Sequence, residues 1–237
     1  MSFKENNYQV IRNVISKDVA HFVYKYFLLK RDVCKTFRLN NYISRFNNDW
    51  GQFGDGQVPK AYAHFGDIAM ETLLTEVQPF VEKMSGVKLI PTYAYARIYN
   101  KGDVLKKHKD RFSCEISTTL NLGGDPWPIF IEPDPKQGTR DEKEHYIASK
   151  SKGIKVELNP GDMLMYRGCV LEHWREIFLG KDCGQVFLHY NDAESNFKYD
   201  KLTNPEQFDS DKNKYDGRPH LGLPAWFRLD KLDRNNK

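Results

Sequence analysis

Apolar residues recur at helical spacing in the first third of the chain and at strand spacing in the middle. After a strand-like run at residues 8–11, Ser16 can cap a helix whose apolar positions continue to about Cys34. A second stripe with helical spacing predicts a helix from about 61 to 84, which Gly86 would end. These two helices precede every long strand-like run.

The middle of the chain is rich in β-branched and aromatic residues, grouped in short runs between turn signals. Strands are predicted at residues 92–99, 115–122, 127–131, 154–158, 163–166 and 184–190. The charged stretch between the third and fourth runs is predicted to be a solvated loop. The fold class is therefore α+β or mostly β, a sandwich or barrel with the N-terminal helices packed on its major sheet.

Two stretches follow neither pattern. Residues 40–60 combine Asn and Gly with embedded aromatic residues such as Trp50, which predicts a long loop, either a passive connection or a lid over a pocket. The polar C-terminal stretch has a few aromatic anchors and is predicted to wrap the domain. We expect one domain over 1–237, with helical support over about 1–88, a β core over about 89–195 and a tail over about 196–237.

Composition sets the class of protein and its surroundings. With 237 residues, 40% hydrophobic and 14% aromatic, the chain can form a substantial core. The net charge of +4 is spread among opposite charges, so we expect no nucleic-acid partner. The four cysteines form no C-x-x-C motif, which favours buried thiols in a reducing compartment. No apolar run is long enough for a membrane span or a signal peptide, so a soluble, cytoplasmic protein is predicted.

One short motif carries potential metal chemistry. His108 and Asp110 are two residues apart, so on a strand both side chains point to the same side. His173, about sixty residues later, follows an Asn-Pro-Gly-Asp turn and an apolar strand that could bring it alongside. Two histidines and a carboxylate form the facial triad of non-haem Fe(II) oxygenases. The alternatives are a surface ion pair for His108 and Asp110 and a hydrogen-bonded core histidine for His173.

These segments together resemble the Fe(II)/2-oxoglutarate-dependent dioxygenases, particularly their prolyl-hydroxylase-like branch. The resemblance covers about residues 90–195. Its individual motifs are weak, whereas their combination in this order is fairly specific. The residues that carry it are Tyr99, Gly102, Leu105, His108-Lys109-Asp110, Thr118-Thr119-Leu120-Asn121, Asn159-Pro160-Gly161-Asp162, His173-Trp174-Arg175-Glu176 and Gln185-Val186-Phe187-Leu188-His189-Tyr190.

The resemblance implies a double-stranded β-helix, the jelly roll of cupin-like proteins, that holds Fe(II) through His108, Asp110 and His173. The cosubstrate 2-oxoglutarate would chelate the iron, and its oxidative decarboxylation to succinate and CO2 would drive hydroxylation of a substrate C–H bond. Ascorbate is a candidate reductant. The implied partner is a small-molecule or peptide substrate, either a free amino acid or a peptidyl residue such as proline, and the sequence leaves the oligomeric state open.

The chain departs from the family at the residue that usually anchors the far carboxylate of 2-oxoglutarate. The family places Arg or Lys there, and this sequence has Gln185. Arg175 is our first choice for the missing cation, followed by Arg111 and Arg97, with Lys181 last. Tyr99 and Thr119 are the other predicted cosubstrate contacts, and Arg97, Trp50 and His189 are predicted to line the substrate pocket.

Two alternatives stay open at this stage. Two histidines and one aspartate do not select a metal on their own, so a cupin-like metalloenzyme with zinc or manganese is possible at the same ligands. The loss of the usual anchor at Gln185 would also suit a catalytically silent barrel used for binding.

Overall fold

The computed structural model describes residues 2–111, 114–143, 145–194, 218, 220–224 and 226–227. Three helices and thirteen strands form within these residues. The helices are α1 (Phe3–Asn6), α2 (Lys17–Leu39) and α3 (Ile68–Ser85). The strands are β1 (Tyr8–Ile11), β2 (Gln52–Phe53), β3 (Tyr62–Phe65), β4 (Leu89–Asn100), β5 (Leu105–His108), β6 (Ile116–Gly124), β7 (Ile129–Ile131), β8 (Thr139–Arg140), β9 (Tyr146–Ile147), β10 (Ile154–Val156), β11 (Met163–Tyr166), β12 (His173–Arg175) and β13 (Asp182–Asp192).

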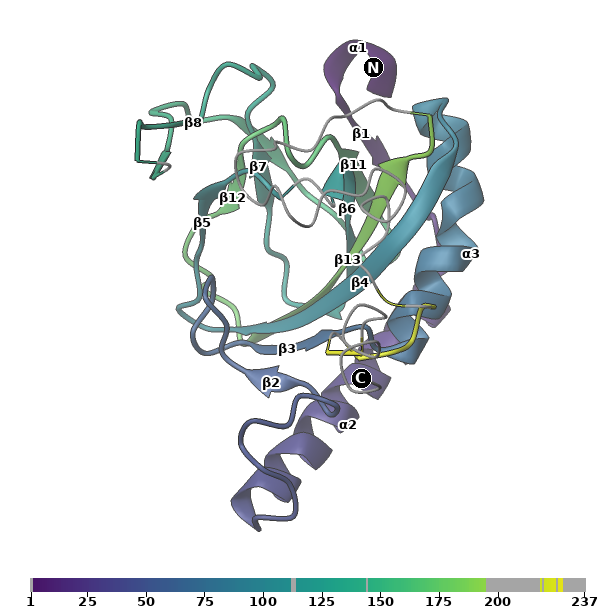
Figure 1. Cartoon of the computed structure of the whole chain (residues 1–237), viewed down its shortest axis with the longest axis vertical. Helices are drawn as coiled ribbons and strands as arrows, with labels where there is room; N and C mark the ends of the chain where they lie inside the picture. The colour runs from purple at the N-terminus through teal and green to yellow at the C-terminus, as the bar shows by residue number, and fades with distance from the viewer. Residues whose placement is uncertain are drawn as a thin grey trace, which may run out of the picture.

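Two antiparallel sheets face each other across an interior that is filled from both sides (Figure 1). The larger sheet has seven strands in the order β1-β11-β6-β13-β4-β3-β2, and the smaller has four in the order β10-β7-β12-β5. Apolar side chains from both sheets meet between them, for example Leu105 of β5 with Tyr99 of β4 and Phe187 of β13. Strands β8 and β9 form a separate two-stranded ribbon.

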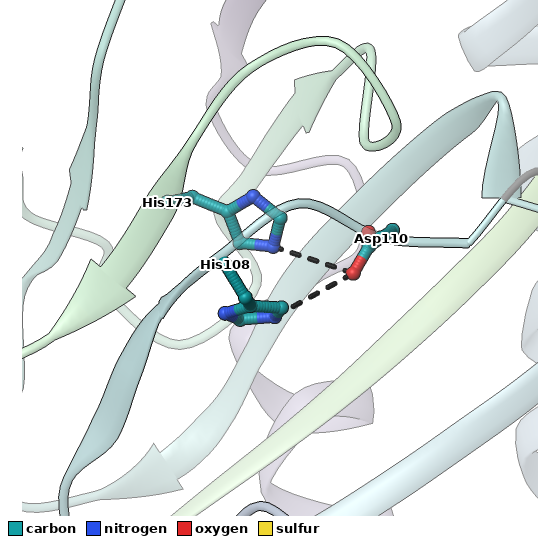
Figure 2. A group of neighbouring side chains, drawn as sticks. All are labelled: His108, Asp110 and His173. Atoms are coloured by element: carbon teal, nitrogen blue, oxygen red, sulfur yellow. Dashed lines mark ion pairs between the residues drawn. The ribbon is translucent and has the colours of Figure 1, made fainter. Parts of the chain in front are cut away.

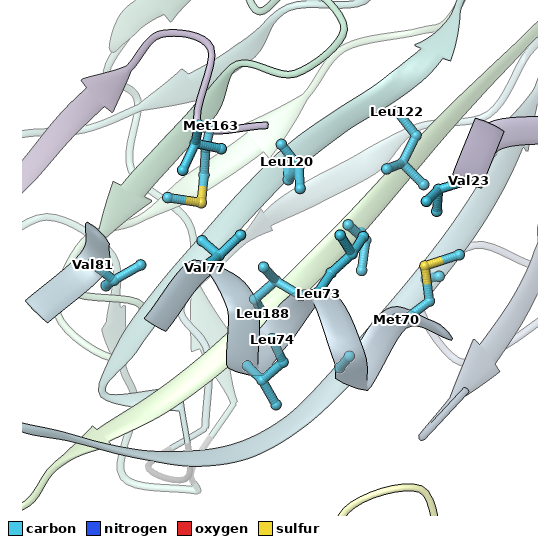
Figure 3. Close-up of a cluster of buried hydrophobic side chains, with 14 of the residues drawn as sticks. Val23, Met70, Leu73, Leu74, Val77, Val81, Leu120, Leu122, Met163 and Leu188 are labelled. Carbon is cyan, nitrogen blue, oxygen red and sulfur yellow. The ribbon is translucent and has the colours of Figure 1, made fainter. Parts of the chain in front are cut away.

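Helices α2 and α3 cover the outer face of the larger sheet. Figure 3 shows Val77 and Leu74 of α3 and Val23 of α2 beside sheet residues such as Leu120 and Leu188. Because side chains alternate along a strand, the neighbours of these sheet residues point the other way, toward the smaller sheet. This alternation places one set of residues in the helix-covered core and the other set in the interior where a site can form.

The predicted start of the first helix and end of the second are confirmed, and the start of the second is wrong. Ser16 caps α2 by accepting a hydrogen bond from the Val19 amide at 3.2 Å, and Gly86 ends α3 with φ +74°. Residues 62–65 form β3 instead of a helical turn, paired with β4. Gly66 follows with φ +72° and Asp67 caps α3. The apolar run there is therefore a strand and a turn that precede the helix.

The other differences from the predicted elements are small. Helix α2 continues to Leu39, and the segment 40–60 contains the two-residue strand β2. The predicted loop 132–153 contains the β8–β9 ribbon. Most of the predicted wrapping tail lies outside the described residues. No helix among the described residues is long and apolar enough to cross a membrane.

Candidate active site

Three side chains from separate segments meet at one end of the smaller sheet. His108 ends β5 and pairs directly with His173, which begins β12, and their ring centroids are 4.3 Å apart. Asp110 follows β5, and its amide is fixed by the Gly168 carbonyl at 2.8 Å. Figure 2 shows both imidazoles turned toward its carboxylate, with Nε2–Oδ1 distances of 3.6 Å for His108 and 3.4 Å for His173. One ligand atom from each residue lies within 4.8 Å of the others.

Neighbouring groups fix the orientation of each of these three side chains. The Nδ1 of His108 lies 2.8 Å from the Lys106 carbonyl, and the Nδ1 of His173 lies 3.0 Å from the Leu171 carbonyl, so Nε2 is left to act as a ligand in both rings. Ser117 donates a hydrogen bond to the other carboxylate oxygen of Asp110 at 2.7 Å. Such contacts are what metal-ligating histidines and carboxylates ordinarily have.

The carboxylate is held in its charged form. Burial alone would raise the pKa of Asp110, but attraction by His173 and hydrogen bonding with His108 hold it well below its usual value. A Cβ at Gly168 would collide with the carboxylate of Asp110 and with the hydroxyl of Ser117, so only glycine fits at this position of the loop. Two imidazole nitrogens and an ionised carboxylate on one side of a centre suit a divalent transition metal and leave other coordination positions open.

A cavity of about 400 Å³ opens beside the triad, between the two sheets. Its lining combines apolar, aromatic and charged side chains. Its lining residues are Asp55, Gly56, Gln57, Phe65, Tyr93, Tyr95, Arg97, Leu105, His108, Lys109, Asp110, Arg111, Cys114, Ile129, Tyr166, His173, Phe187 and His189. The enclosed volume is within the range of small-molecule sites.

Arg175 lies two residues beyond His173, fully buried between the sheets. Its Nη2 donates to Thr119 Oγ1 at 3.3 Å and to Gln185 Oε1 at 3.1 Å, and its Nη1 donates to the Trp127 carbonyl. Its Nε has no hydrogen-bond partner, and no carboxylate in the described part of the chain lies within ion-pair distance. Burial lowers the pKa of this guanidinium. Its buried charge has no compensating anion among the described residues.

Arg97 differs from Arg175, because its charge is neutralised. Its Nε and Nη2 both donate to Asp55 Oδ2, at 2.9 and 2.5 Å, and Nη2 also donates to Gln57 at 2.8 Å. Tyr95 donates to the same carboxylate at 2.7 Å, and Arg97 Nη1 donates to the hydroxyl of buried Tyr99 at 3.1 Å. Residues 55–57 are therefore the part of the 40–60 segment that reaches the cavity.

The remaining predicted site residues are dispersed. His189 and Arg111 line the cavity, and the Nδ1 of His189 lies 3.1 Å from Ser117 Oγ. Trp50 does not line the cavity, so its place in the predicted pocket is a correction. Its ring packs edge-on against the ring of Phe37 of α2, with the ring centroids 5.2 Å apart. Its carbonyl accepts a hydrogen bond from the hydroxyl of Tyr62 in β3. Lys181 is exposed beside Asp125.

Three contributors to the site escaped prediction. Asp55 and Gln57 stand in a glycine-flanked turn whose pairing partner is forty residues away, and no local pattern signals that contact. Ser117 belongs to a recognised strand, where its alternation with Thr119 could have placed it inward. Burial raises the pKa of Tyr93, whose ring packs on His189, well above the usual value, so that hydroxyl stays protonated.

Solved structures of the same fold are numerous, although no protein family and no curated protein matches the sequence. A Pseudomonas putida prolyl-4-hydroxylase superimposes with a TM-score of 0.52 at 10% identity, over 80% of this chain and 95% of that one. The chain has the fold of iron and 2-oxoglutarate enzymes. The α-ketoglutarate-dependent epimerase SnoN from nogalamycin biosynthesis gives 0.57 at 13% identity, over 81% of this chain and 80% of that one.

HygX from Streptomyces hygroscopicus, solved with nickel and 2-oxoglutarate bound, gives a TM-score of 0.53 at 13% identity, over 81% of this chain and 85% of that one. SnoN has been solved with Fe3+ and α-ketoglutarate. One of these neighbours is a prolyl-4-hydroxylase and another is an epimerase, so what this chain is shown to share with them is the fold.

Proposed function

We propose that this chain is an Fe(II)- and 2-oxoglutarate-dependent oxygenase, a single domain over residues 1–237 built on a double-stranded β-helix. His108, Asp110 and His173 are its metal ligands. The observation that carries the proposal is the convergence of these three side chains on the wall of a partly enclosed cavity, with both imidazoles held by backbone carbonyls. The fold shared with iron and 2-oxoglutarate enzymes supports it.

Arg175 would bind the far carboxylate of 2-oxoglutarate, together with Thr119 and Gln185. Two residues along a strand advance about 6.6 Å, so Arg175 stands one dicarboxylate length from His173. Its buried charge has no carboxylate partner among the described residues, and a bound carboxylate would supply one. Gln185 then has a role that differs from the usual anchor: its Oε1 holds the guanidinium in place at 3.1 Å. Tyr99 supports the same wall from β4.

When bound, iron and 2-oxoglutarate would supply the chemistry that activates dioxygen, the oxidant: one oxygen atom would enter the substrate as the new hydroxyl, the other would enter succinate, and CO2 would be released. The chain's own residues position the reactants and exclude water. Leu105, Ile129 and Phe187 form apolar cavity walls, and the Asp55–Arg97 pair closes the side formed by β4. We propose an amino-acid or peptidyl C–H bond as the target, with proline as one possibility supported by the prolyl-4-hydroxylase likeness.

Metal-dependent turnover of 2-oxoglutarate tests this proposal. Protein purified without oxygen is given Fe(II), 2-oxoglutarate, ascorbate and candidate substrates, air is then admitted, and succinate is measured beside iron content. His108→Ala should lose both iron and succinate formation, whereas His145→Ala, which removes an exposed histidine of the β8–β9 ribbon, should keep both. Wild-type protein that binds neither iron nor 2-oxoglutarate refutes the proposal. Exclusive binding of zinc or manganese would favour another metalloenzyme, and absent 2-oxoglutarate affinity would favour a binding protein.

A further inference from the structure

The charged side chains that line the cavity do not cancel. Asp55 and Arg97 form a closed pair, with an Nη2–Oδ2 distance of 2.5 Å. Asp110 belongs to the metal triad. Lys109 donates from Nζ to the Pro135 carbonyl at 2.9 Å, so its ammonium is turned toward the 132–153 segment. This leaves Arg111, an exposed residue that lines the cavity, as the cation without a carboxylate partner among the described residues.

Arg111 is fixed on an aromatic support. Its Nε and Nη2 donate to the Tyr93 hydroxyl at 3.3 and 3.1 Å, and its guanidinium carbon lies 5.2 Å from the centre of that ring. The Tyr93 ring is itself held between Phe65 at 4.8 Å and His189 at 4.6 Å. Neither an aspartate nor a glutamate among the described residues forms an ion pair with Arg111. These contacts, together with a hydrogen-bond contact to Cys114, hold the guanidinium in a fixed place among the residues that line the cavity.

The proposed ligands do not neutralise this charge, and the inference rests on the proposed function at this step. The charges of Fe(II) and Arg175 are balanced by Asp110 and the two carboxylates of 2-oxoglutarate. With both ligands in place, the Asp55–Arg97 pair is still neutral and Arg111 is still uncompensated. A positive charge in a partly enclosed, largely apolar cavity attracts an anion more strongly than it would in water.

We propose that the substrate carries a carboxylate and that Arg111 binds it. The planar guanidinium matches a planar carboxylate, and the Tyr93 support fixes its direction, so the substrate would be held by its acid group beside the metal. Arg111 lines the cavity of about 400 Å³, whereas Arg175 does not, so the molecule that Arg111 binds there is a small carboxylic acid such as an amino acid. Arg111 then selects the substrate, while Arg175 selects the cosubstrate.

Fluorine NMR with a small probe pair tests the assignment without requiring turnover. Trifluoroacetate serves as the carboxylate, and trifluoroacetamide as its uncharged counterpart. Both are added to protein loaded with Mn(II) and saturated with 2-oxoglutarate, and paramagnetic relaxation of the fluorine signal is measured. We expect enhancement for trifluoroacetate alone, with affinity reduced roughly tenfold or more in Arg111→Gln and partly kept in Arg111→Lys. Arg31→Gln, an equal charge change on α2, should behave as wild type.

The outcomes separate the role of Arg111 from the proposed oxygenase function. Undiminished relaxation in Arg111→Gln, or equal relaxation by the amide, overturns the role of Arg111. Water-proton relaxation and circular dichroism report Mn(II) loading and folding separately. If wild-type protein takes up neither Mn(II) nor 2-oxoglutarate, the proposed function fails, and line broadening of trifluoroacetate by the metal-free protein still tests Arg111. Broadening that Arg111→Gln removes supports the anion site, and broadening that it leaves unchanged refutes the site.

Discussion

Arg175→Met removes the charge that we assign to the far carboxylate of 2-oxoglutarate. In the wild-type complex, this guanidinium would be paired in a site with no exposure to water. Removing one partner of a buried ion pair costs about 3–5 kcal/mol. Such a loss corresponds to at least about a hundredfold weaker binding of 2-oxoglutarate.

Thermal unfolding with and without cosubstrate measures this loss. With Mn(II) present and 2-oxoglutarate at a hundred times its wild-type Kd, binding stabilises the wild-type fold by about 2.7 kcal/mol. At the same concentration, a hundredfold weaker variant gains only about 0.4 kcal/mol. For a domain of this size each kcal/mol shifts the Tm by about 2–4 °C, so the cosubstrate-induced shift falls from about 5–11 °C to about 1 °C.

The unliganded variant should fold. Thr119 Oγ1 and Gln185 Oε1 are already 3.1 Å apart and can keep a hydrogen bond to each other, and the methionine can pack on the Trp127 ring that Arg175 now covers at 5.1 Å. The exposed Arg31→Gln variant serves as the control and should keep the full shift. An Arg175→Met protein with the wild-type shift, or with a Kd within threefold of wild type, would refute the anchor.

Three further predictions concern one group beside the triad and two carboxylates at the start of α3. Ser117→Ala should weaken metal binding about tenfold in chelator competition, because Asp110 loses a hydrogen bond of 2.7 Å; an unchanged affinity would contradict this support. Glu71→Gln should lower the free energy of unfolding in urea by about 3–5 kcal/mol, because Arg218 would be left buried without its partner at 2.6 Å; a loss below about 1 kcal/mol would be inconsistent with the pair. Burial alone would raise the pKa of Asp67, but the hydrogen bond with His64 and the attraction of Lys30 on α2 lower it. The charged carboxylate should therefore stabilise the fold fully above about pH 4, and this stabilisation should be lost in more acid solution. The difference in unfolding free energy between wild type and Asp67→Asn should therefore be constant from pH 7 to 5 and shrink toward pH 3. Growth of that difference on acidification would refute the lowered pKa of Asp67.

Local sequence pattern predicted most of the elements, and it also singled out His108 and Asp110 as candidate metal ligands. Helical spacing after Ser16 and strand spacing around 163–166 are properties of a few consecutive residues, so each could be predicted without knowing its neighbours. His108 and Asp110 share a short motif. His173 needed the resemblance as well, because only the pairing of β5 with β12 brings it alongside.

Contacts between distant segments could not be predicted. The run 62–65 has apolar residues that suit the end of a helical stripe as well as a strand, and its pairing with β4 decides the outcome. Asp55 meets Arg97 across about forty residues, and nothing near either one signals the other. Trp50 was expected in the substrate pocket because the 40–60 segment could be a lid over it, and the ring instead packs against Phe37 of α2.

The short strand β5 has one neighbour only among the described strands, β12, and the register between the two is irregular beyond His173. An ion held jointly by His108 and His173 would cross-link this sheet margin where main-chain bonds are fewest. Iron supply would then govern local rigidity as well as reactivity. The amide hydrogens of β5 would exchange faster in protein depleted of iron than in iron-loaded protein, with a smaller change in the strands beneath α2 and α3.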